Sequence, residues 1–198
     1  IAGFIALMTF ASTILYFAQS DLVYSAMTDR GERTAFLAKI DLTVNILTIV
    51  FEVYLTARLI RWLGVGLTLA VIPAAVAVGF LALGVYPTLA TLVVVQIIYR
   101  AGRYGMTKPA REILFTVVSR EEKYKSKAFI DAAVYRGGDL VSGWIYAGLA
   151  FVGLSLGTIA MLAAPVAAMW AILGIRVAAK GDVKAAEMES EKVTMPVA

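Results

Sequence analysis

Charged and amide side chains recur at helical spacing inside strongly apolar segments of this chain, and they are its candidates for chemistry. Steps of three and four residues place the members of each stripe on one face of a helix. Two stripes are clear: Asp41, Asn45, Thr48 and Glu52 in one segment, and Gln96, Arg100, Arg103 and Thr107 in another. A third segment carries Asp131, Tyr135, Gly138 and Ser142, with Arg136 and Asp139 alongside. Near the centre of a bilayer an ionisable residue costs about 2.5–3.5 kcal/mol, so such residues mark a pathway, a gate or a polar interior.

The chemistry open to these side chains is the attraction of an anion and the opening and closing of ion pairs. Arginines attract an anionic solute, and carboxylates at the same depth can pair with them or release them. The candidate substrate-binding or gating residues are Glu52, Gln96, Arg100, Arg103, Asp131, Arg136 and Asp139. Counting from the ends of the apolar runs places four of them at one depth, in the cytoplasmic half of the membrane: Glu52, Arg100, Arg136 and Asp139. The alternative is that these charges only fasten helices together, as Arg136 and Asp139 could at i, i+3.

The elements that must hold these residues are six apolar runs. Hydrophobic residues make up 61% of the 198 and charged residues 16%, and the mean hydropathy is +0.83, outside the range of soluble globular proteins. The runs cover residues 1–27, 35–62, 65–85, 88–106, 129–152 and 154–177, and each can cross a hydrocarbon core that needs about 20 helical residues. We expect an all-α integral membrane protein whose six transmembrane helices form a half-domain of residues 1–179. The runs without charged stripes, 65–85 and 154–177, are expected to face lipid.

The distribution of Lys and Arg predicts the orientation of these helices. All of the 18 except Arg30, Arg33 and Lys39 fall on one side if the helices alternate in direction. The positive-inside rule then puts both ends of this chain in the cytoplasm, as expected for a multi-pass protein of a bacterial inner membrane. Residues 180–198 are small, charged and poor in large apolar side chains, which predicts a disordered cytoplasmic tail.

The composition argues against several classes of function. The chain has no Cys and no His, which excludes thiol chemistry, disulfides, imidazole catalysis and histidine metal ligands. It has no glycine-rich phosphate-binding loop, no metal-ligand cluster and no recognisable catalytic Ser or carboxylate pair, so we expect neither an enzyme nor a cofactor. The net charge of +4 fits membrane orientation and does not indicate a nucleic-acid partner.

The segment from 108 to 139 resembles a known transporter family. It contains KPAREILFTVV, REEKYKSKAFID and YRGGD, and it is similar to the C-terminal half of the ATP/ADP exchangers of plastids and intracellular bacteria, a branch of the major facilitator superfamily. The matching residues are Pro109, Arg111, Glu112, Lys125, Lys127, Ile130, Asp131 and Arg136. The turn ARLIRWLG at 57–64 also resembles that superfamily's short basic loop. The resemblance implies two six-helix halves around a central cavity, each half built from inverted three-helix repeats.

The resemblance also implies a mechanism and site residues. The exchangers are antiporters that need a Glu in the second helix of this half, and Glu52 is its counterpart by helix and depth. They also need a Lys a few residues beyond the matched arginine, where this chain has Gly137, Gly138 and Asp139. An anion in place of that cation reverses a Coulomb energy of about 4 kcal/mol at 4 Å and an effective dielectric of 20. This departure counts against ATP/ADP exchange itself.

The function expected from these features is secondary transport of an organic anion by alternating access, with ATP and ADP as candidates. Two alternatives stay open. One is a non-transporting scaffold or anchor that binds a partner or anionic lipid through Lys123, Lys125 and Lys127, and the other is a proton-coupled facilitator of another small solute. Six helices are too few for the usual facilitator cavity, so the expected partners include a missing N-terminal half or a second copy of the chain, besides membrane lipid.

Overall fold

The computed structural model describes residues 1–115 and 120–194, and every element in these residues is a helix. The elements are α1 Ala2–Ala26, α2 Arg30–Val50, η1 Phe51–Leu55, α3 Thr56–Val85, α4 Leu89–Gly102, η2 Arg103–Thr107, α5 Lys108–Leu114, α6 Arg120–Phe129, η3 Ile130–Val134, α7 Tyr135–Phe151 and α8 Leu156–Thr194. The three η elements are single π-helical stretches that connect the α-helices on either side of them without a break. The predicted all-α fold is confirmed, and the described part of each predicted apolar run is almost entirely helical.

Side-chain caps and one glycine determine where several helices begin and end. Asp29 precedes α2 and accepts a hydrogen bond from the backbone N–H of Glu32 at 2.8 Å. Thr88 precedes α4 and accepts one from the backbone N–H of Thr91 at 3.2 Å. Within α3, Gly64 has a φ of 74° and a ψ of 173°, which breaks the helix between the second and third apolar runs. A residue with a Cβ rarely adopts this conformation, so glycine is what permits the chain to turn here.

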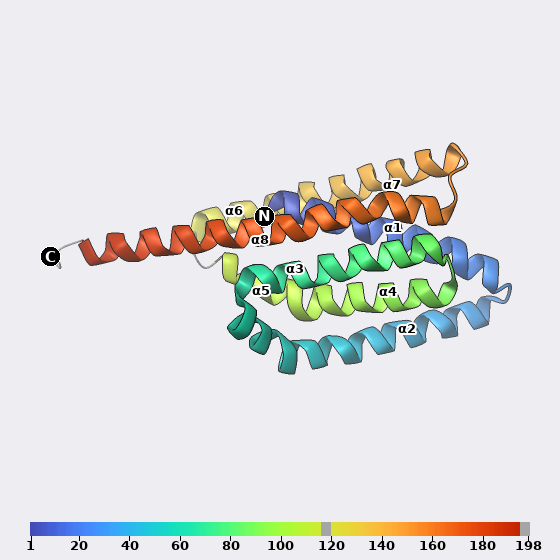
Figure 1. Cartoon of the computed structure of the whole chain (residues 1–198), viewed down its shortest axis with the longest axis horizontal. Helices are drawn as coiled ribbons and strands as arrows, with labels where there is room; N and C mark the ends of the chain where they lie inside the picture. The colour runs from blue at the N-terminus through green and yellow to red at the C-terminus, as the bar shows by residue number, and fades with distance from the viewer. Residues whose placement is uncertain (116–119, 195–198) are drawn as a thin grey trace.

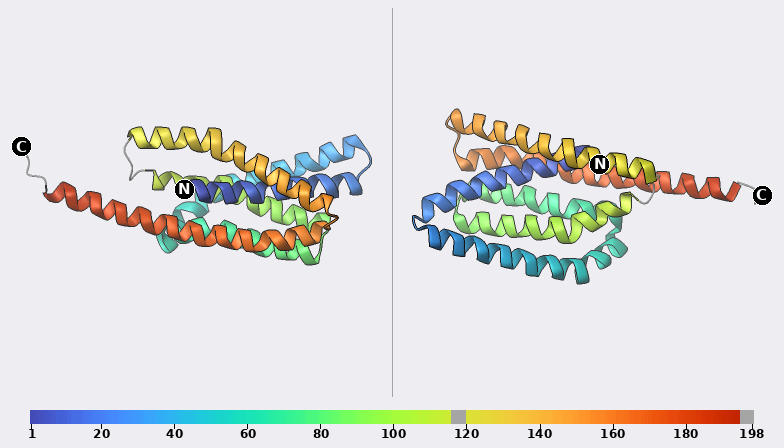
Figure 2. Two further views of the ribbon diagram at one scale, coloured as in Figure 1. Left: turned by 90° about the horizontal axis from the view of Figure 1, so that it is seen from above. Right: turned by 180° about the vertical axis from the view of Figure 1, so that it is seen from behind.

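The six longest helices form two sets of three whose contacts match: α1, α2 and α3 in one set, and α4, α7 and α8 in the other. α1 packs against α4, α7 and α8, whereas α4 packs against α1, α2 and α3. α3 and α8 also pack against each other along their lengths. Exchanging α1 with α4, α2 with α7 and α3 with α8 leaves every one of these contacts in place. In the right-hand view of Figure 2, α1 and α4 accordingly lie between α7 and α2, and α3 and α8 form the layer behind them.

The core lies where α1, α3, α4 and α8 meet. Trp170 of α8 is fully buried, and its ring centroid lies 5.5 Å from that of Phe4 on α1 and 6.4 Å from that of Tyr99 on α4. Small residues allow α3 and α8 to approach closely where α3 ends and α8 begins. A Cβ added to Gly157 would lie 2.8 Å from the carbonyl oxygen of Gly84. Such contacts through glycine are typical of helix packing in membranes.

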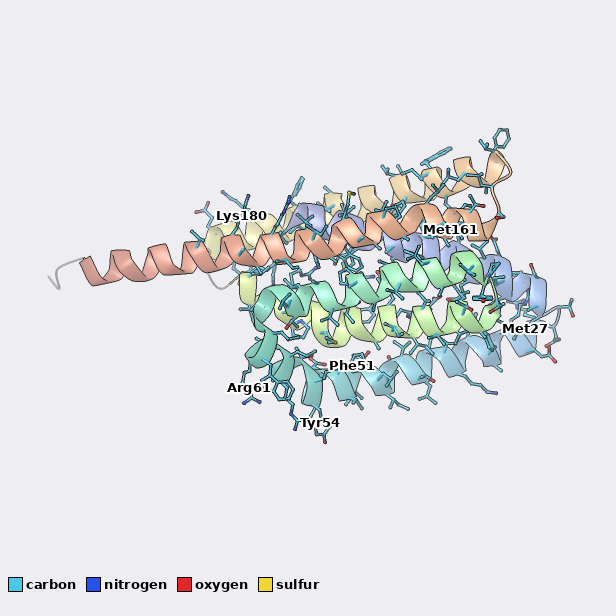
Figure 3. The ribbon with its side chains drawn as sticks, in the orientation of Figure 1. Met27, Phe51, Tyr54, Arg61, Met161 and Lys180 are labelled. Atoms are coloured by element: carbon cyan, nitrogen blue, oxygen red, sulfur yellow. The ribbon has the colours of Figure 1, made fainter. Side chains whose placement is uncertain are left out.

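Large apolar side chains remain exposed on the outside of the bundle (Figure 3). Those on α3 and α8 include Val78, Leu81, Leu162, Met169 and Ile172. A protein surrounded by water rarely leaves large apolar patches uncovered, whereas lipid covers them without cost. By length and composition, three helical stretches can cross a membrane: Ala2–Ala26, Arg30–Val85 and Leu156–Gly181. The chain therefore has helices long and apolar enough to cross a membrane, which agrees with the predicted class of protein.

α8 continues well beyond the last apolar run and extends past the rest of the bundle (Figure 1). The sequence predicts a disordered tail from residue 180, whereas the structure has helix over residues 180–194. Two physical reasons favour helix here. Ala, Glu, Lys and Met are strong helix formers, and extending an existing helix needs no new nucleus. Residues 195–198 of the predicted tail lie outside the described residues.

Candidate functional site: the polar face

Polar side chains gather on the side of the bundle formed by α1, by α4 with η2 and α5, and by the start of α7. Three cavities open here, and we name them after a lining residue: the Lys108 cavity of about 250 Å³, the Gln96 cavity of about 290 Å³ and the Asp139 cavity of about 370 Å³. The first two share Arg103 and Tyr104, and the last two share Ser12 and Tyr16. The three therefore form one hollowed strip. The residues that line it are called the polar face below.

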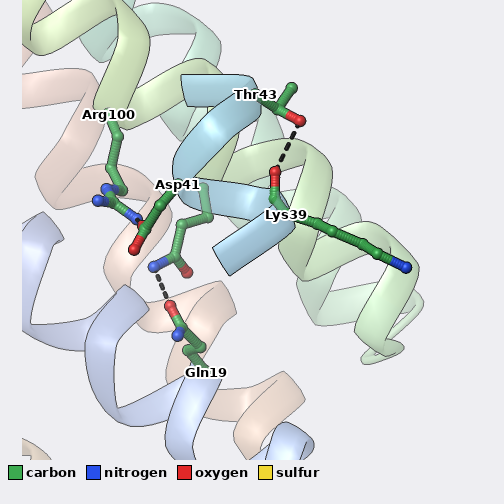
Figure 4. Close-up of polar contacts among 6 residues, drawn as sticks. Gln19, Lys39, Asp41, Thr43 and Arg100 are labelled. Carbon is green, nitrogen blue, oxygen red and sulfur yellow. Dashed lines mark hydrogen bonds and ion pairs between the residues drawn. The ribbon is translucent and has the colours of Figure 1, made fainter. Parts of the chain in front are cut away.

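Two polar links tie α4 to its neighbours beside the Gln96 cavity (Figure 4). The guanidinium of Arg100 donates to the carboxylate of Asp41 on α2 at 2.6 Å, and the amide of Gln96 donates to that of Gln19 on α1. The sequence places Arg100 at the depth of Glu52, but the structure pairs Arg100 with Asp41. The carbonyl oxygen of the buried Gln96 side chain has no hydrogen-bond partner. This leaves a buried acceptor unsatisfied beside the cavity.

We expect the Arg100–Asp41 pair to show the coupling of a direct ion pair. Removing one partner leaves the other charge without compensation, so Arg100→Gln and Asp41→Asn should each lower the thermal unfolding midpoint in lipid nanodiscs. The double variant should lose less than the sum of the two losses. Both side chains are partly exposed, so the expected coupling is about 0.5–1 kcal/mol. Strictly additive losses would argue against the pair.

Arg103 lies at the junction of the Lys108 and Gln96 cavities, and three tyrosines surround its guanidinium. It donates to the hydroxyl of Tyr99 at 3.3 Å, and its central carbon lies 5.5 Å from the ring centroid of Tyr104 and 5.7 Å from that of Tyr135. Among the side chains that the structure describes, it makes no ion pair with a carboxylate. An arginine held by neutral rings keeps its charge, and its planar group remains able to bind an anion.

The Asp139 cavity lies between α1 and α7. The hydroxyl of Thr13 is 3.4 Å from the carboxylate of Asp139, and the hydroxyl of Tyr146 donates to Asp21 nearer the other end of the two helices. Asp139 is exposed, and the described side chains include no cation paired with it. This end of the polar face therefore carries a carboxylate that is open to solvent or to a bound solute.

The remaining predicted site residues lie elsewhere. Arg136 is exposed and lines none of the three cavities, and its predicted pair with Asp139 is not formed among the described ion pairs. Glu52 is exposed within η1 and is also outside the three cavities. Asp131 belongs to η3, but its side chain lies outside the described part of the chain. The predicted residues that the structure brings to the polar face are Gln96, Arg100, Arg103 and Asp139.

Two of the π-helical stretches meet beside this face. η2 begins at Arg103 and packs against η1. The hydroxyl of Thr56 joins them, because it lies within hydrogen-bonding distance of the carbonyl oxygens of Phe51 and Gly105. Single π turns in α-helices are frequent at functional sites. They also add a residue to the local turn, so a stripe counted with a period of 3.6 residues loses its register beyond them.

The sequence predicts only part of the set of aromatic and basic side chains that surround Arg103. A partial signal exists for Tyr99, one helical turn before Arg103, and for Arg111, about two turns after it. No such signal exists for Tyr135, because it comes from a different helix. Lys108 and Arg111 belong to the segment with the family resemblance, but spacing alone does not assign them to a cavity.

Comparisons with protein-family models, with characterised proteins and with solved structures give no match for this chain. The resemblance of residues 108–139 to the ATP/ADP exchangers therefore stays a sequence-based expectation. Across the described residues, no group of three or more Asp, Glu, His or Cys side chains is placed to hold a metal ion. What the polar face offers is a row of cations, hydroxyls and amides, which suits the binding of a solute.

Proposed function

We propose that this chain is the transport unit of a secondary transporter of the major facilitator type, which moves an organic anion across a membrane by alternating access. The proposal includes six membrane spans, cytoplasmic ends for this chain, and the polar face as the wall of the solute path. The observation that carries it is the polar face itself. It is a hollowed, charged strip on a helical bundle whose opposite layer exposes large apolar side chains.

The position of the strip favours a solute path that lies between two units over a pocket enclosed within one. Charged groups at membrane depth need water or another protein surface against them. α1 and α4 form the floor of the strip, and α7 and α2 flank it. A second six-helix unit, either another part of a longer protein or a second copy, would cover the strip and enclose a central cavity.

The packing pattern supports the same class of protein. The contacts are preserved when the set α1, α2 and α3 is exchanged with the set α4, α7 and α8. α1 and α4 run in opposite directions, as the chain trace in Figure 1 shows. Inverted repeats of three helices are a common plan of secondary transporters, with the solute site where the repeats meet. The Gln96 cavity lies between α1 and α4 and the Asp139 cavity between α1 and α7, and at both places the two sets are in contact.

The charge of the polar face favours an anion. Among its described side chains, the cations are Arg100, Arg103, Lys108 and Arg111, and the carboxylate is Asp139. Asp41 neutralises Arg100 from the side, which leaves an excess of positive charge. A groove with low-dielectric walls concentrates the field of such charges and draws in anions. ATP and ADP are candidate solutes through the resemblance of residues 108–139.

The scaffold alternative has less support from the structure. In its basic segment, Lys125 pairs with Glu121 at 2.6 Å and Lys127 pairs with Glu112 at 2.7 Å. Both lysines are therefore partly neutralised within the chain. A surface for an acidic partner is expected to keep such charges available.

A labelling experiment tests whether the polar face contacts water within the membrane. The chain has no Cys, so a single introduced cysteine reacts without background. Tyr16 of the polar face and Val78 of α3 are equally exposed in the structure, at 66% and 67%. In liposomes, Tyr16→Cys should react with a water-soluble, membrane-impermeant thiol reagent, and Val78→Cys should not. A transported anion should slow the reaction at position 16. Equal reactivity of the two positions would contradict the proposal.

A further inference from the structure

We propose that the Lys108 cavity is a binding site for a phosphate group. The cavity, of about 250 Å³, lies between α1, η2 with α5, and the start of α7. Its charged lining residues are Arg103, Lys108 and Arg111, and no described carboxylate lines it. The inference rests on the proposed function, in which Arg103 lines the path of the solute. It concerns binding, however, which can be measured without transport.

The two arginines of the cavity are held around one tyrosine. Arg111 donates to the hydroxyl of Tyr135 at 3.0 Å, and the guanidinium of Arg103 lies 5.7 Å from the ring centroid of the same residue. In the described part of the chain, neither arginine has a carboxylate partner, and the same is true of Lys108. Like charges in this arrangement repel one another, and a bound anion would relieve the repulsion.

Two buried polar atoms of the cavity residues also lack a partner. They are the Nε of Arg111 and the hydroxyl oxygen of Thr107. A buried polar group without a partner is costly, so native proteins normally satisfy it with protein, water or ligand. The hydroxyl of Tyr135 accepts from Arg111 and can still donate its own hydrogen. Guanidinium, ammonium and hydroxyl donors therefore converge on one cavity.

A phosphate group matches these donors better than a carboxylate does. A phosphate monoester carries a charge of about −1.5 to −2 and three acceptor oxygens, whereas a carboxylate has one charge and two oxygens. Arginine presents its N–H groups in a fork that fits phosphate oxygens. A water molecule occupies about 30 Å³, so the cavity has room for a phosphate group together with ordered waters. A soluble compound or the headgroup of an anionic lipid could carry this group.

Binding is to be measured on the complete protein in nanodiscs of neutral phosphatidylcholine. Inorganic pyrophosphate is the soluble probe, and its binding is followed by the rise in the unfolding temperature, with sodium chloride of equal ionic strength as the blank. Phosphatidic acid, added to the nanodisc lipid, is the membrane probe. Its binding is followed by native mass spectrometry as lipid retained on the protein. We expect at least one of the probes to bind.

Lys108→Gln is the decisive variant, because Lys108 is exposed and has no partner in the described residues, so its loss should not disturb the fold. Affinity for the bound probe should fall about tenfold or more, and Arg111→Gln should have the same effect. Arg61→Gln removes a cation that does not line the cavity and should bind like the unmodified protein.

The outcomes separate the two ligand sources and the two proposals. Binding of pyrophosphate alone indicates a soluble ligand, and binding of phosphatidic acid alone indicates a lipid headgroup. Binding of neither probe overturns the inference, as does an equal loss in Arg61→Gln and Lys108→Gln. Anion uptake without phosphate binding would overturn this inference and leave the transport proposal standing, and phosphate binding without uptake would do the reverse.

Discussion

Replacing Arg103 with Gln should reduce anion uptake by about tenfold to a hundredfold and leave membrane insertion intact. Arg103 is the cation shared by the Lys108 and Gln96 cavities, and no described carboxylate neutralises it. A hydrogen bond from a charged group contributes about 1.5–3 kcal/mol, which corresponds to that range in affinity. Its neighbour Tyr99 also donates to the backbone oxygen of Met8 at 3.1 Å, so the ring should stay in place after the substitution. Initial rates of uptake into proteoliposomes measure the effect.

Three further variants show whether position or charge alone matters. Arg103→Lys keeps the charge but loses the planar fork, so its uptake should be intermediate. Arg136→Gln and Arg61→Gln each remove one positive charge away from the three cavities (Arg61 is labelled in Figure 3), and their uptake should fall far less. If Arg136→Gln lost as much uptake as Arg103→Gln, the central place given to Arg103 would be wrong and the sequence-based expectation for Arg136 would be favoured.

Adding a single methyl group at Gly105 should destabilise the protein by about 1–3 kcal/mol. A Cβ there would lie 2.7 Å from the Cβ of Phe51 and 2.9 Å from the backbone oxygen of Thr48. Neither atom is the flexible end of a side chain, so η1 and η2 would have to separate. Their separation would also strain the hydrogen bond from Thr56 to the Gly105 carbonyl. The midpoint of thermal unfolding of Gly105→Ala in detergent measures the loss.

Gly137→Ala is the matched control for this prediction. Gly137 also lies in a helix, but a Cβ added there would have no atom within 4 Å. Alanine has a helix propensity about 1 kcal/mol better than glycine, so this variant should be neutral or more stable. If Gly105→Ala were as stable as Gly137→Ala, the close contact of η1 with η2 would not exist in the protein.

The helices could be predicted from the sequence because long apolar runs with polar interruptions determine where helix forms. The short turn after Ala26 separates α1 from α2, and the one after Val85 separates α3 from α4. The break at Gly64 follows the second apolar run. Composition predicted disorder for the chain after residue 180, where the structure has helix, because low hydrophobicity and high helix propensity point in opposite directions there.

For the candidate site, the sequence predicts which residues share one side of a single helix, but not which residues of other helices they contact. Spacing correctly places Gln96, Arg100 and Arg103 along one side of a helix, since all three line the Gln96 cavity. It cannot tell which residue of another helix they meet, because partners depend on how helices are rotated and packed. The ion pair with Asp41 and the approach of Tyr135 to Arg103 are of this kind. The π turns add a change of register that periodicity does not reveal.

The most direct test of anion transport along the polar face is a flux measurement on the complete protein in liposomes. Labelled ATP, ADP and other organic anions should be tried with and without a counter-anion inside, and with and without a pH gradient. We predict saturable uptake of at least one anion, which Arg103→Gln lowers by about tenfold to a hundredfold. Dependence on the internal anion would indicate exchange, and dependence on the pH gradient would indicate proton coupling. For folded protein, uptake of every anion at the level of protein-free liposomes would contradict the proposed function.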